Sequence, residues 1–469
     1  MIAIRNSIAA QDLVPAINRL FELSAQKIRS IEASWNPRRG TPVFTVEGRY
    51  TTRGWTEWTR GFQYGAAILQ FDATEDRSFL DIGIEGTLKH MASHVSHTGV
   101  HDHGFNIVST FGNLLRLMRE GRIQERRDVC AELCQMALKV SGAVQAARWT
   151  PLPDHLGFIH SFNGPHSLFI DTMRSLRSLA LAHSLGHVLM GEQDEKISLL
   201  ARLLQHAETT ARYTVYWGEG RDRYDVRGRT SHESIFNIRN GSFRCPSTQQ
   251  GYSPFSTWTR GLAWAILGFT EQLEYLAKLP EADLECDPGI FAANRQDWLK
   301  RFQDAACATA DHYFECAAID GIPFWDTGAP GLSAMPDWAQ KPSDPYNNHE
   351  PVDSSAAAIS AQGLLRLGRC LNQQGENKNG ERYIQAGLTI AETLFQEPYL
   401  STDPNHQGLI LHSIYHRPNG WDRIPPEMRV PCGESSMWGD YHARELALLI
   451  FRMAKGQPHY DFFTSILSG

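Results

Sequence analysis

The chain has 469 residues, 42% of them hydrophobic and 21% charged, and its formal net charge is -7. This length allows a large buried core, and the absence of long Lys and Arg runs excludes the basic stripe typical of nucleic-acid-binding proteins. No apolar stretch could span a membrane and the eight cysteines show no zinc spacing, which indicates a reduced, cytoplasmic protein.

Helical periodicity dominates the chain, because apolar residues recur at spacings of three and four positions. In the first half we expect helices over 13–31, 59–71, 79–95, 105–118, 126–147 and 167–190. In the second half we expect them over 194–215, 257–277, 297–315, 354–371, 381–395 and 437–453. Short strand-like pieces at 42–50 and 409–415 lie between helices. Paired as hairpins, these helices predict an all-α fold, an (α/α)6 toroid formed by residues 1–469 as a single domain.

Three long loops, over 217–257, 318–351 and 399–435, are rich in Gly, Pro, Asn and Asp and also contain aromatic residues. Loops longer than about 15 residues in a compact domain are usually functional or disordered, and the aromatic content favours function. We expect the loops to gather at one mouth of the toroid. No phosphate-binding or dinucleotide-binding glycine motif is present, so we expect no cofactor.

A first candidate segment is His101-Asp102-His103-Gly104-Phe105, just before a predicted helix. Asp102 has two interpretations, because a carboxylate at this point can cap the helix or take part in chemistry. The two flanking histidines have no evident third ligand, so we expect no metal site here.

A second candidate is Asp171, which lies in the apolar run 167–190. A carboxyl group placed one turn into a buried helix must be solvated, paired or protonated with a raised pKa. A raised pKa is what a general acid requires at neutral pH. Asp171 is therefore the best catalytic candidate in the chain, although a buried cap or ion pair remains an alternative.

The sequence Trp-Thr-Arg-Gly occurs twice, at 58–61 and 258–261, each time before an apolar helix. Trp offers a flat apolar face and Arg a fixed fork of donors, and together they suit an acidic sugar. Helix starts whose Trp side chains are simply core residues are the alternative. Asp353 is better explained as a helix cap, and the polar segment 433–441 as closure of the toroid. His232 follows a basic cluster that would suit an anion, or that is merely solvated: Arg221, Arg223, Arg227 and Arg229.

In their order along the chain, these motifs resemble those of the unsaturated glucuronyl hydrolases of glycoside hydrolase family 88. The matching pieces are 58–62, 101–105, 170–173, 250–252, 256–264, 353–356 and 438–441. The resemblance implies an (α/α)6 barrel and an acidic oligosaccharide with a 4,5-unsaturated uronic acid at its non-reducing end. It also implies hydration: the C4 carbon is protonated, water adds at C5, and the resulting hemiketal opens to release the next sugar.

Carried over by position, the resemblance implies that Asp171 is the general acid and base and that Asp102 orients the substrate and holds the pKa of its partner up. It implies substrate contacts by Arg260, whose guanidinium could pair with the uronate, and by further residues: Trp258, Trp264, Gln250, His232, Gln249 and Trp58. Gln249 stands where the family usually has His, and Leu262 where Gln is common. Nothing in the sequence predicts an oligomeric state.

Four alternatives remain open. An unsaturated rhamnogalacturonyl hydrolase or a saturated uronosidase could use the same barrel. A sugar 2-epimerase-like isomerase shares the toroid but uses paired histidines, and His101, His103, His232 and His349 are available for that chemistry. A non-catalytic sugar-binding protein is the fourth alternative.

Overall fold

The computed structural model describes residues 1–55, 57–125, 128–285 and 294–464, and most of its helices coincide with predicted ones. These are α1 (Val14–Ser34), α2 (Arg60–Thr74), α3 (Arg77–His90), α7 (Ala131–Ala147), α10 (Leu199–Tyr213), α11 (Thr259–Leu276), α13 (Arg295–Cys316), α14 (Ser354–Gln373), α15 (Asn377–Leu394) and α16 (Met437–Ala454). Two short helices were not predicted separately, α4 (Ala92–Val95) and α12 (Glu281–Glu285). Residues 126 and 127 of the predicted helix 126–147 lie outside the described residues. No helix in the described part of the chain is long and apolar enough to cross a membrane.

The predicted helix 105–118 is continuous but changes its winding. It consists of α5 (His103–Ile107), a π-helical turn (Val108–Gly112) and α6 (Asn113–Arg119). Single π-helical turns inside α-helices are often found beside functional sites. Here the turn directly follows the segment that contains Asp102.

The predicted helix 167–190 is wrong in its first and last parts. Residues Ser167–Phe169 form strand β5, and helix begins only in α8 (Thr172–Ser175) and α9 (Arg177–Ser184). β5 pairs antiparallel with β8 (Glu233–Phe236), which in turn pairs with β9 (Phe243–Ser247). A short buried apolar run fits a strand or a helix equally well, and pairing with a distant segment decided the outcome.

The remaining strands form small two-stranded sheets between helices. These are β1 (Phe44–Val46) with β2 (Arg49–Thr51), β3 (Trp149–Pro151) with β4 (Gly157–Ile159), and β6 (Leu189–Met190) with β7 (Lys196–Ile197). The strand-like piece 42–50 thus falls within the β1–β2 hairpin. The piece 409–415 makes only isolated bridges, Ile410 with Leu400 and Ser413 with Glu434.

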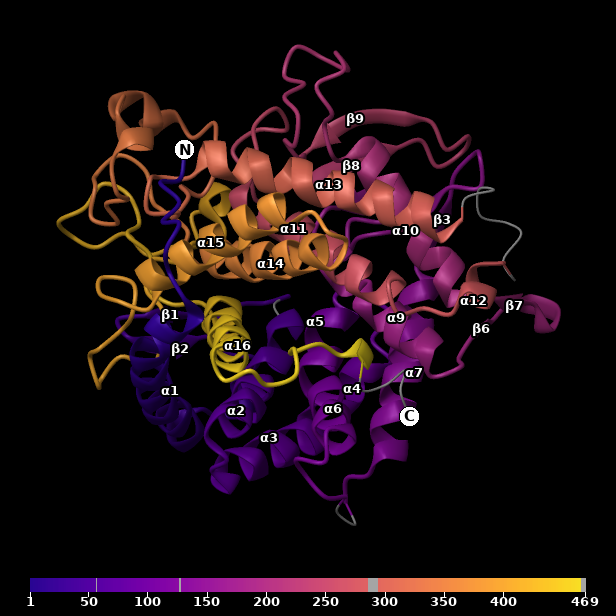
Figure 1. Ribbon diagram of the computed structural model, residues 1–469, viewed down its shortest axis with the longest axis horizontal. Coiled ribbons are helices and arrows are strands. Elements are labelled where there is room, and N and C mark those ends of the chain that lie inside the picture. The colour runs from indigo at the N-terminus through magenta and orange to yellow at the C-terminus, as the bar shows by residue number, and fades with distance from the viewer. Residues whose placement is uncertain (56, 126–127, 286–293, 465–469) are drawn as a thin grey trace.

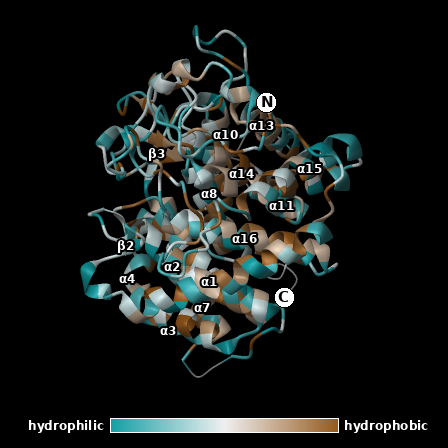
Figure 2. Ribbon diagram, turned by 90° about the vertical axis from the view of Figure 1, so that its left-hand side faces the viewer, coloured by the Kyte–Doolittle hydropathy of each residue, from teal (hydrophilic) through white to brown (hydrophobic). Residues whose placement is uncertain are grey.

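The helices form two layers (Figure 1). In the inner layer α2, α5 to α6, α8 to α9, α11, α14 and α16 contact one another in this order, and α16 returns to α2. In the outer layer α3 covers α2, α7 and α10 cover α9, α13 covers α11, α15 covers α14, and α1 packs on α16 and α2. Every residue of α11 is buried, including the charged side chains of Arg260, Glu271 and Glu274, so this helix lies entirely inside the protein. Figure 2 shows hydrophobic residues concentrated in the interior helices and hydrophilic ones at the periphery.

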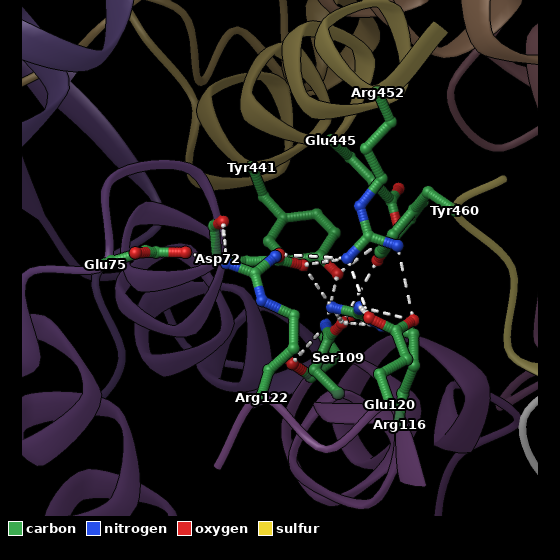
Figure 3. Close-up of polar contacts among 11 residues, drawn as sticks. Asp72, Glu75, Ser109, Arg116, Glu120, Arg122, Tyr441, Glu445, Arg452 and Tyr460 are labelled. Atoms are coloured by element: carbon green, nitrogen blue, oxygen red, sulfur yellow. Dashed lines mark hydrogen bonds and ion pairs between the residues drawn. The ribbon is translucent and has the colours of Figure 1, made fainter. Parts of the chain in front are cut away.

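A buried ionic network joins three inner helices near their C-terminal ends (Figure 3). The Asp72 carboxylate on α2 accepts hydrogen bonds from Arg116 on α6 at 2.6 Å, from Arg452 on α16 at 3.0 Å, and from Arg122. Glu120 pairs with the Arg116 and Arg452 guanidinium groups. Burial raises the pKa of Asp72, but the three guanidinium groups more than offset this and lower it below the ordinary value.

We predict that Asp72→Asn lowers the free energy of unfolding by about 3 kcal/mol, because removing one partner leaves buried charges uncompensated. The Asp72 pKa is lowered by folding, so this stabilisation is present above the ordinary carboxyl pKa of about 3.9 and is lost as the pH falls toward the folded-state value. Chemical denaturation of both proteins at pH 7 measures the difference. The matched variant Asp337→Asn removes only an exposed ion pair with Lys341 and should leave the midpoint unchanged. Equal midpoints for wild type and Asp72→Asn would contradict the prediction.

Candidate active site

A single histidine nitrogen lies between the two predicted catalytic carboxylates. The Nε2 atom of His101 is 3.1 Å from Oδ1 of Asp171 and 3.7 Å from Oδ1 of Asp102. All three side chains are buried, with Asp102 and Asp171 each 8% exposed and His101 2%. The structure therefore brings Asp102 and Asp171 together, with His101 as the bridge.

Close packing of the backbone makes this arrangement possible. Asp102 immediately precedes α5, and Asp171 stands between β5 and α8. Gly104 on α5 donates its N–H to the Ser175 hydroxyl at 2.8 Å, and a Cβ atom on Gly104 would lie only 2.5 Å from the Ser175 Cα. Glycine at this position thus allows the two segments to approach.

Neither carboxylate is used as a helix cap. Asp102 and Asp171 both occupy N-cap positions, yet neither side chain accepts a capping hydrogen bond. The capping interpretation of Asp102 is therefore wrong. The placement of Asp171 one turn inside a helix is also wrong, because that residue lies at a junction between strand and helix.

Burial and mutual charge interactions shift the pKa values of His101, Asp102 and Asp171 in different directions. Burial lowers the pKa of His101, but the Asp102 and Asp171 carboxylates raise it above the ordinary histidine value. Burial raises the pKa of Asp102, and the charge of Asp171 adds to that increase. Burial also raises the pKa of Asp171, but its hydrogen bond and charge interaction with His101, together with His232 and Arg260, lower it overall. The expected raised pKa of Asp171 is therefore wrong, and the raised values belong to His101 and Asp102.

His232 immediately precedes β8 and lies beside this group. Its ring packs against Phe169 at 4.5 Å and Trp258 at 4.6 Å between centroids. The Nδ1 atom accepts the backbone N–H groups of Gln249 at 2.9 Å and Gln250 at 3.2 Å, so the ring proton is fixed on Nε2. Burial lowers the pKa of His232 to about 4. The result is a neutral imidazole whose buried Nε2–H has no partner among the described residues.

Arg260 is already fully engaged within the protein. Its Nη2 donates to the side-chain oxygen of Gln250 at 2.7 Å and to the Tyr415 carbonyl at 2.8 Å. Its Nη1 donates to Asp353 at 3.3 Å and to the Ile414 carbonyl. The geometry does not present a free guanidinium to a uronate. Arg260 instead positions Gln250 and contributes positive charge near Asp171.

The predicted Trp residues lie in two places. Trp258 packs under the Arg260 guanidinium at 4.7 Å, and half-buried Trp58 stacks on Trp438 at 5.2 Å. Trp264 is 2% exposed and packs among Phe105 and His442, so it belongs to the inner wall of the ring.

Further residues near the carboxylates were not among the predicted site residues. Trp438 lies 4.8 Å from the Arg260 guanidinium and 4.9 Å from the Tyr415 ring. Phe162 is 55% exposed and stacks on the His101 ring at 6.2 Å. His101 itself could have been selected from the His101-Asp102 pair, but Tyr415 and Phe162 lie in loops without a distinctive motif.

Gln249 does not point to the same neighbours as Gln250. Its side-chain amide donates to Oε2 of Glu233 at 3.2 Å. The Oε1 atom of Glu233 is held by Asn163 and Ser167. These bonds fix the Gln249 backbone, which holds the tautomer of His232.

The two weaker candidate segments have clear roles. Asp353 caps α14 by accepting the Ser355 N–H at 3.0 Å, which confirms the capping interpretation, and it also pairs with Arg260. In the segment 433–441, Ser436 caps α16 and Asp440 accepts backbone N–H groups from Leu409 and Ile410, which fits closure of the ring.

The site lies where inner helices begin. Five of its residues stand within two positions of the starts of α5, α8, α11, α14 and α16: Asp102, Asp171, Trp258, Asp353 and Trp438. Helix N-termini carry partial positive charge and favour anions. Within the described ranges, no group of three or more His, Cys, Asp or Glu side chains lies close enough together to hold a metal ion.

Comparison with known proteins supports the resemblance. No protein-family model matches the chain. The unsaturated glucuronyl hydrolase of Bacillus sp. strain GL1 is 27% identical over 87% of this chain and 90% of its own length. The unsaturated glucuronyl hydrolase of Formosa agariphila is 26% identical over 83% of this chain and 78% of its own length. The crystal structure of the unsaturated glucuronyl hydrolase from Bacillus sp. GL1 superposes with a TM-score of 0.68 at 22% identity, covering 95% of this chain and 97% of that one. The resemblance to the unsaturated glucuronyl hydrolases, which are glycoside hydrolases, is therefore confirmed in sequence and in fold.

Proposed function

We propose that this enzyme hydrolyses oligosaccharides that carry a 4,5-unsaturated uronic acid at the non-reducing end, by hydrating the C4=C5 bond. The observation that carries the proposal is the buried His101 Nε2 between Asp102 and Asp171, in a chain similar to unsaturated glucuronyl hydrolases. The closed ring of paired helices supports the predicted (α/α)6 toroid as one domain over residues 1–469.

Asp171 is the proposed acid and base, and His101 stores its proton. The raised pKa of His101 and the lowered pKa of Asp171 favour an imidazolium that is hydrogen bonded to a carboxylate. When a substrate carboxylate approaches and excludes water, the pKa of Asp171 rises, because both a like charge and desolvation disfavour ionisation. The proton can then move from Nε2 across the 3.1 Å hydrogen bond to Asp171 and on to C4.

The remaining steps conserve atoms and charge. Protonation of C4 converts the enol ether into an oxocarbenium ion centred on C5 and the ring oxygen. The Asp171 carboxylate then takes a proton from water as the water oxygen bonds to C5. The hemiketal opens by breaking the bond between C5 and the ring oxygen, which leaves a ketone at C5 and a hemiacetal at C1. The hemiacetal then collapses to an aldehyde, and its hydroxyl proton leaves with the next sugar, without displacement at the anomeric carbon.

Asp102 serves as the second carboxyl group. Burial raises its pKa, and in either protonation state the carboxyl group can accept a hydrogen bond. The Asp102 carboxyl accepts no hydrogen bond from the described residues, and His101 Nε2 lies 3.7 Å away, beyond hydrogen-bond distance. It is therefore available to a substrate hydroxyl or carboxylate.

The other predicted residues contribute binding. The Nε2–H of His232 and the amide of Gln250 offer directed hydrogen bonds. Trp258 and Trp58 supply flat apolar surface for a sugar ring. The N-termini of α8, α11 and α16 favour the uronate carboxylate, with Arg260 acting as a positioning residue rather than as the direct partner.

We predict that Asp171→Asn lowers kcat/KM by at least about 10³-fold and Asp102→Asn by about 10²-fold, because each removes a group that handles the proton. Loss of ultraviolet absorbance by the C4=C5 bond of unsaturated uronyl disaccharides from several lyases measures turnover. The matched variant Asp337→Asn should react like wild type.

Other outcomes separate the alternatives. An Asp171→Asn rate within tenfold of wild type would contradict the assignment of the acid. Release of sugar only from saturated uronosides, or isomerisation without release, would replace the proposed substrate. A strong preference for rhamnose as the second sugar would favour the rhamnogalacturonyl alternative.

The pH profile tests the role of His101. We predict that kcat/KM falls with rising pH as His101 loses its proton, at an apparent pKa above the ordinary histidine value of about 6.5. In His101→Asn, the amide keeps a hydrogen-bond donor but cannot store a proton, so this alkaline limb should move to lower pH. An unchanged limb in His101→Asn would assign the titration to another group.

A further inference from the structure

A second concave site lies away from the carboxylates. It is a cavity of about 540 Å³ between the C-terminal end of α10 and α13. Four of its lining residues are arginines, against two acidic residues: Arg212, Arg221, Arg227, Arg301, Glu219 and Asp304, with Trp217 between them. We refer to it as the arginine pocket. None of these residues surrounds Asp171, so the basic cluster seen in the sequence does not line the candidate active site.

Three of the four guanidinium groups have no carboxylate partner among the described residues, and one of these three, Arg221, is held instead by backbone carbonyls. Arg221 caps α10 by donating to the carbonyls of Tyr213 at 2.8 Å and Val215 at 3.0 Å, and Arg301 pairs with Glu208 at 2.8 Å. Arg212 and Arg227 are exposed, and no carboxylate among the described residues lies within 4.0 Å of either. Because Asp304 is paired with Lys300 at 2.9 Å, its charge is already balanced.

The loop that presents these groups is well ordered by its own contacts. The Asp225 carboxylate accepts the N–H groups of Gly218, Glu219 and Arg221 at 2.8 to 3.0 Å. Gly228, with φ of +81°, packs against α13 so closely that a Cβ atom would lie 1.9 Å from the Ala308 carbonyl oxygen. Only glycine fits there, and the contact holds Arg227 at the pocket.

Trp217 completes the wall. Its Nε1 donates to the Ala211 carbonyl at 2.8 Å, and its ring lies 5.5 Å from the Arg227 guanidinium and 4.8 Å from that of Arg301. Cation–π contacts of this kind orient guanidinium groups without neutralising them. The forks of Arg227 and Arg301 are thus positioned in advance on one aromatic side chain.

We propose that the arginine pocket binds a multiply charged oxyanion, a sulfate or phosphate group. Such groups accept paired N–H donors from guanidinium forks. Arg212 and Arg227 supply positive charge that no nearby carboxylate offsets. Trp217 orients the forks of Arg227 and Arg301. The volume accommodates a sugar that bears the group. The arginine pocket is separate from the candidate active site. The binding proposal can therefore be correct or wrong independently of the proposed hydration reaction.

Titration calorimetry of the full chain tests this proposal, with inorganic sulfate, inorganic phosphate and a hexose phosphate as separate probes and acetate as the singly charged comparison. We expect one site per chain for at least one of the multiply charged probes. We expect Arg212→Gln/Arg227→Gln to weaken it at least about tenfold, because both uncompensated cations are lost. The hexose phosphate binding more tightly than inorganic phosphate would identify a phosphorylated sugar as the ligand class, and sulfate binding best would identify a sulfated one.

Arg223→Gln is the matched control, since Arg223 is exposed on the same loop but does not line the pocket. It should bind like wild type. Circular dichroism melting verifies that each variant is folded, and the single variants Arg212→Gln and Arg227→Gln replace the double one if it is not. Absence of binding by wild type, equal binding by the double variant, or equal loss in Arg223→Gln would overturn the proposal.

Discussion

The contact on which the candidate site depends is the approach of one imidazole nitrogen to two buried carboxylates. Two carboxylates in a water-poor site repel each other, and one of them would ordinarily stay protonated. His101 changes this balance, because its Nε2–H is held by Asp171 while Asp102 remains within 3.7 Å. In the proposed mechanism the proton is shared among these three groups, and the acid required for protonation of C4 is stored beside the carboxylate that delivers it.

The two ends of the inner helices have different roles: the N-terminal ends carry site residues and the C-terminal parts carry buried ion pairs. Their N-terminal ends carry Asp102, Asp171, Trp258 and Trp438, where helix dipoles favour an anionic ligand. Their C-terminal parts carry buried ion pairs, such as Asp72 with Arg116 and Arg452 on three different helices. These pairs link the inner helices to one another near their C-terminal ends (Figure 3). Because the ion pairs hold the C-terminal parts of the inner helices together, the loops at the N-terminal ends can differ in length without disturbing the carboxylates.

Much of the fold could be predicted from the sequence, because the periodicity of helices such as α11 and α14 is local information. The strand β5 could not, since its pairing with β8 joins segments more than sixty residues apart. For the site, motifs identified Asp102, Asp171 and His232 as candidates, but they did not predict the direction of the pKa shifts or the hydrogen-bond partners. The pKa of Asp171 depends on His101, and the donors of Arg260 depend on carbonyls of residues 414 and 415, which are distant in sequence. The basic cluster around Arg227 was visible in the sequence, but only the packing on α13 separated it from the active site.

The most direct test of hydration is to run the reaction with an unsaturated uronyl disaccharide in deuterium oxide and to locate deuterium in the uronic acid product by NMR. The account predicts one deuterium bound to C4 in product examined early in the reaction, before slower exchange at C4, which lies next to the C5 ketone, adds more. The C4=C5 bond is lost in the step that releases the second sugar. A product that keeps its C4=C5 bond and carries no deuterium at C4 would show cleavage at the anomeric carbon and would contradict the account.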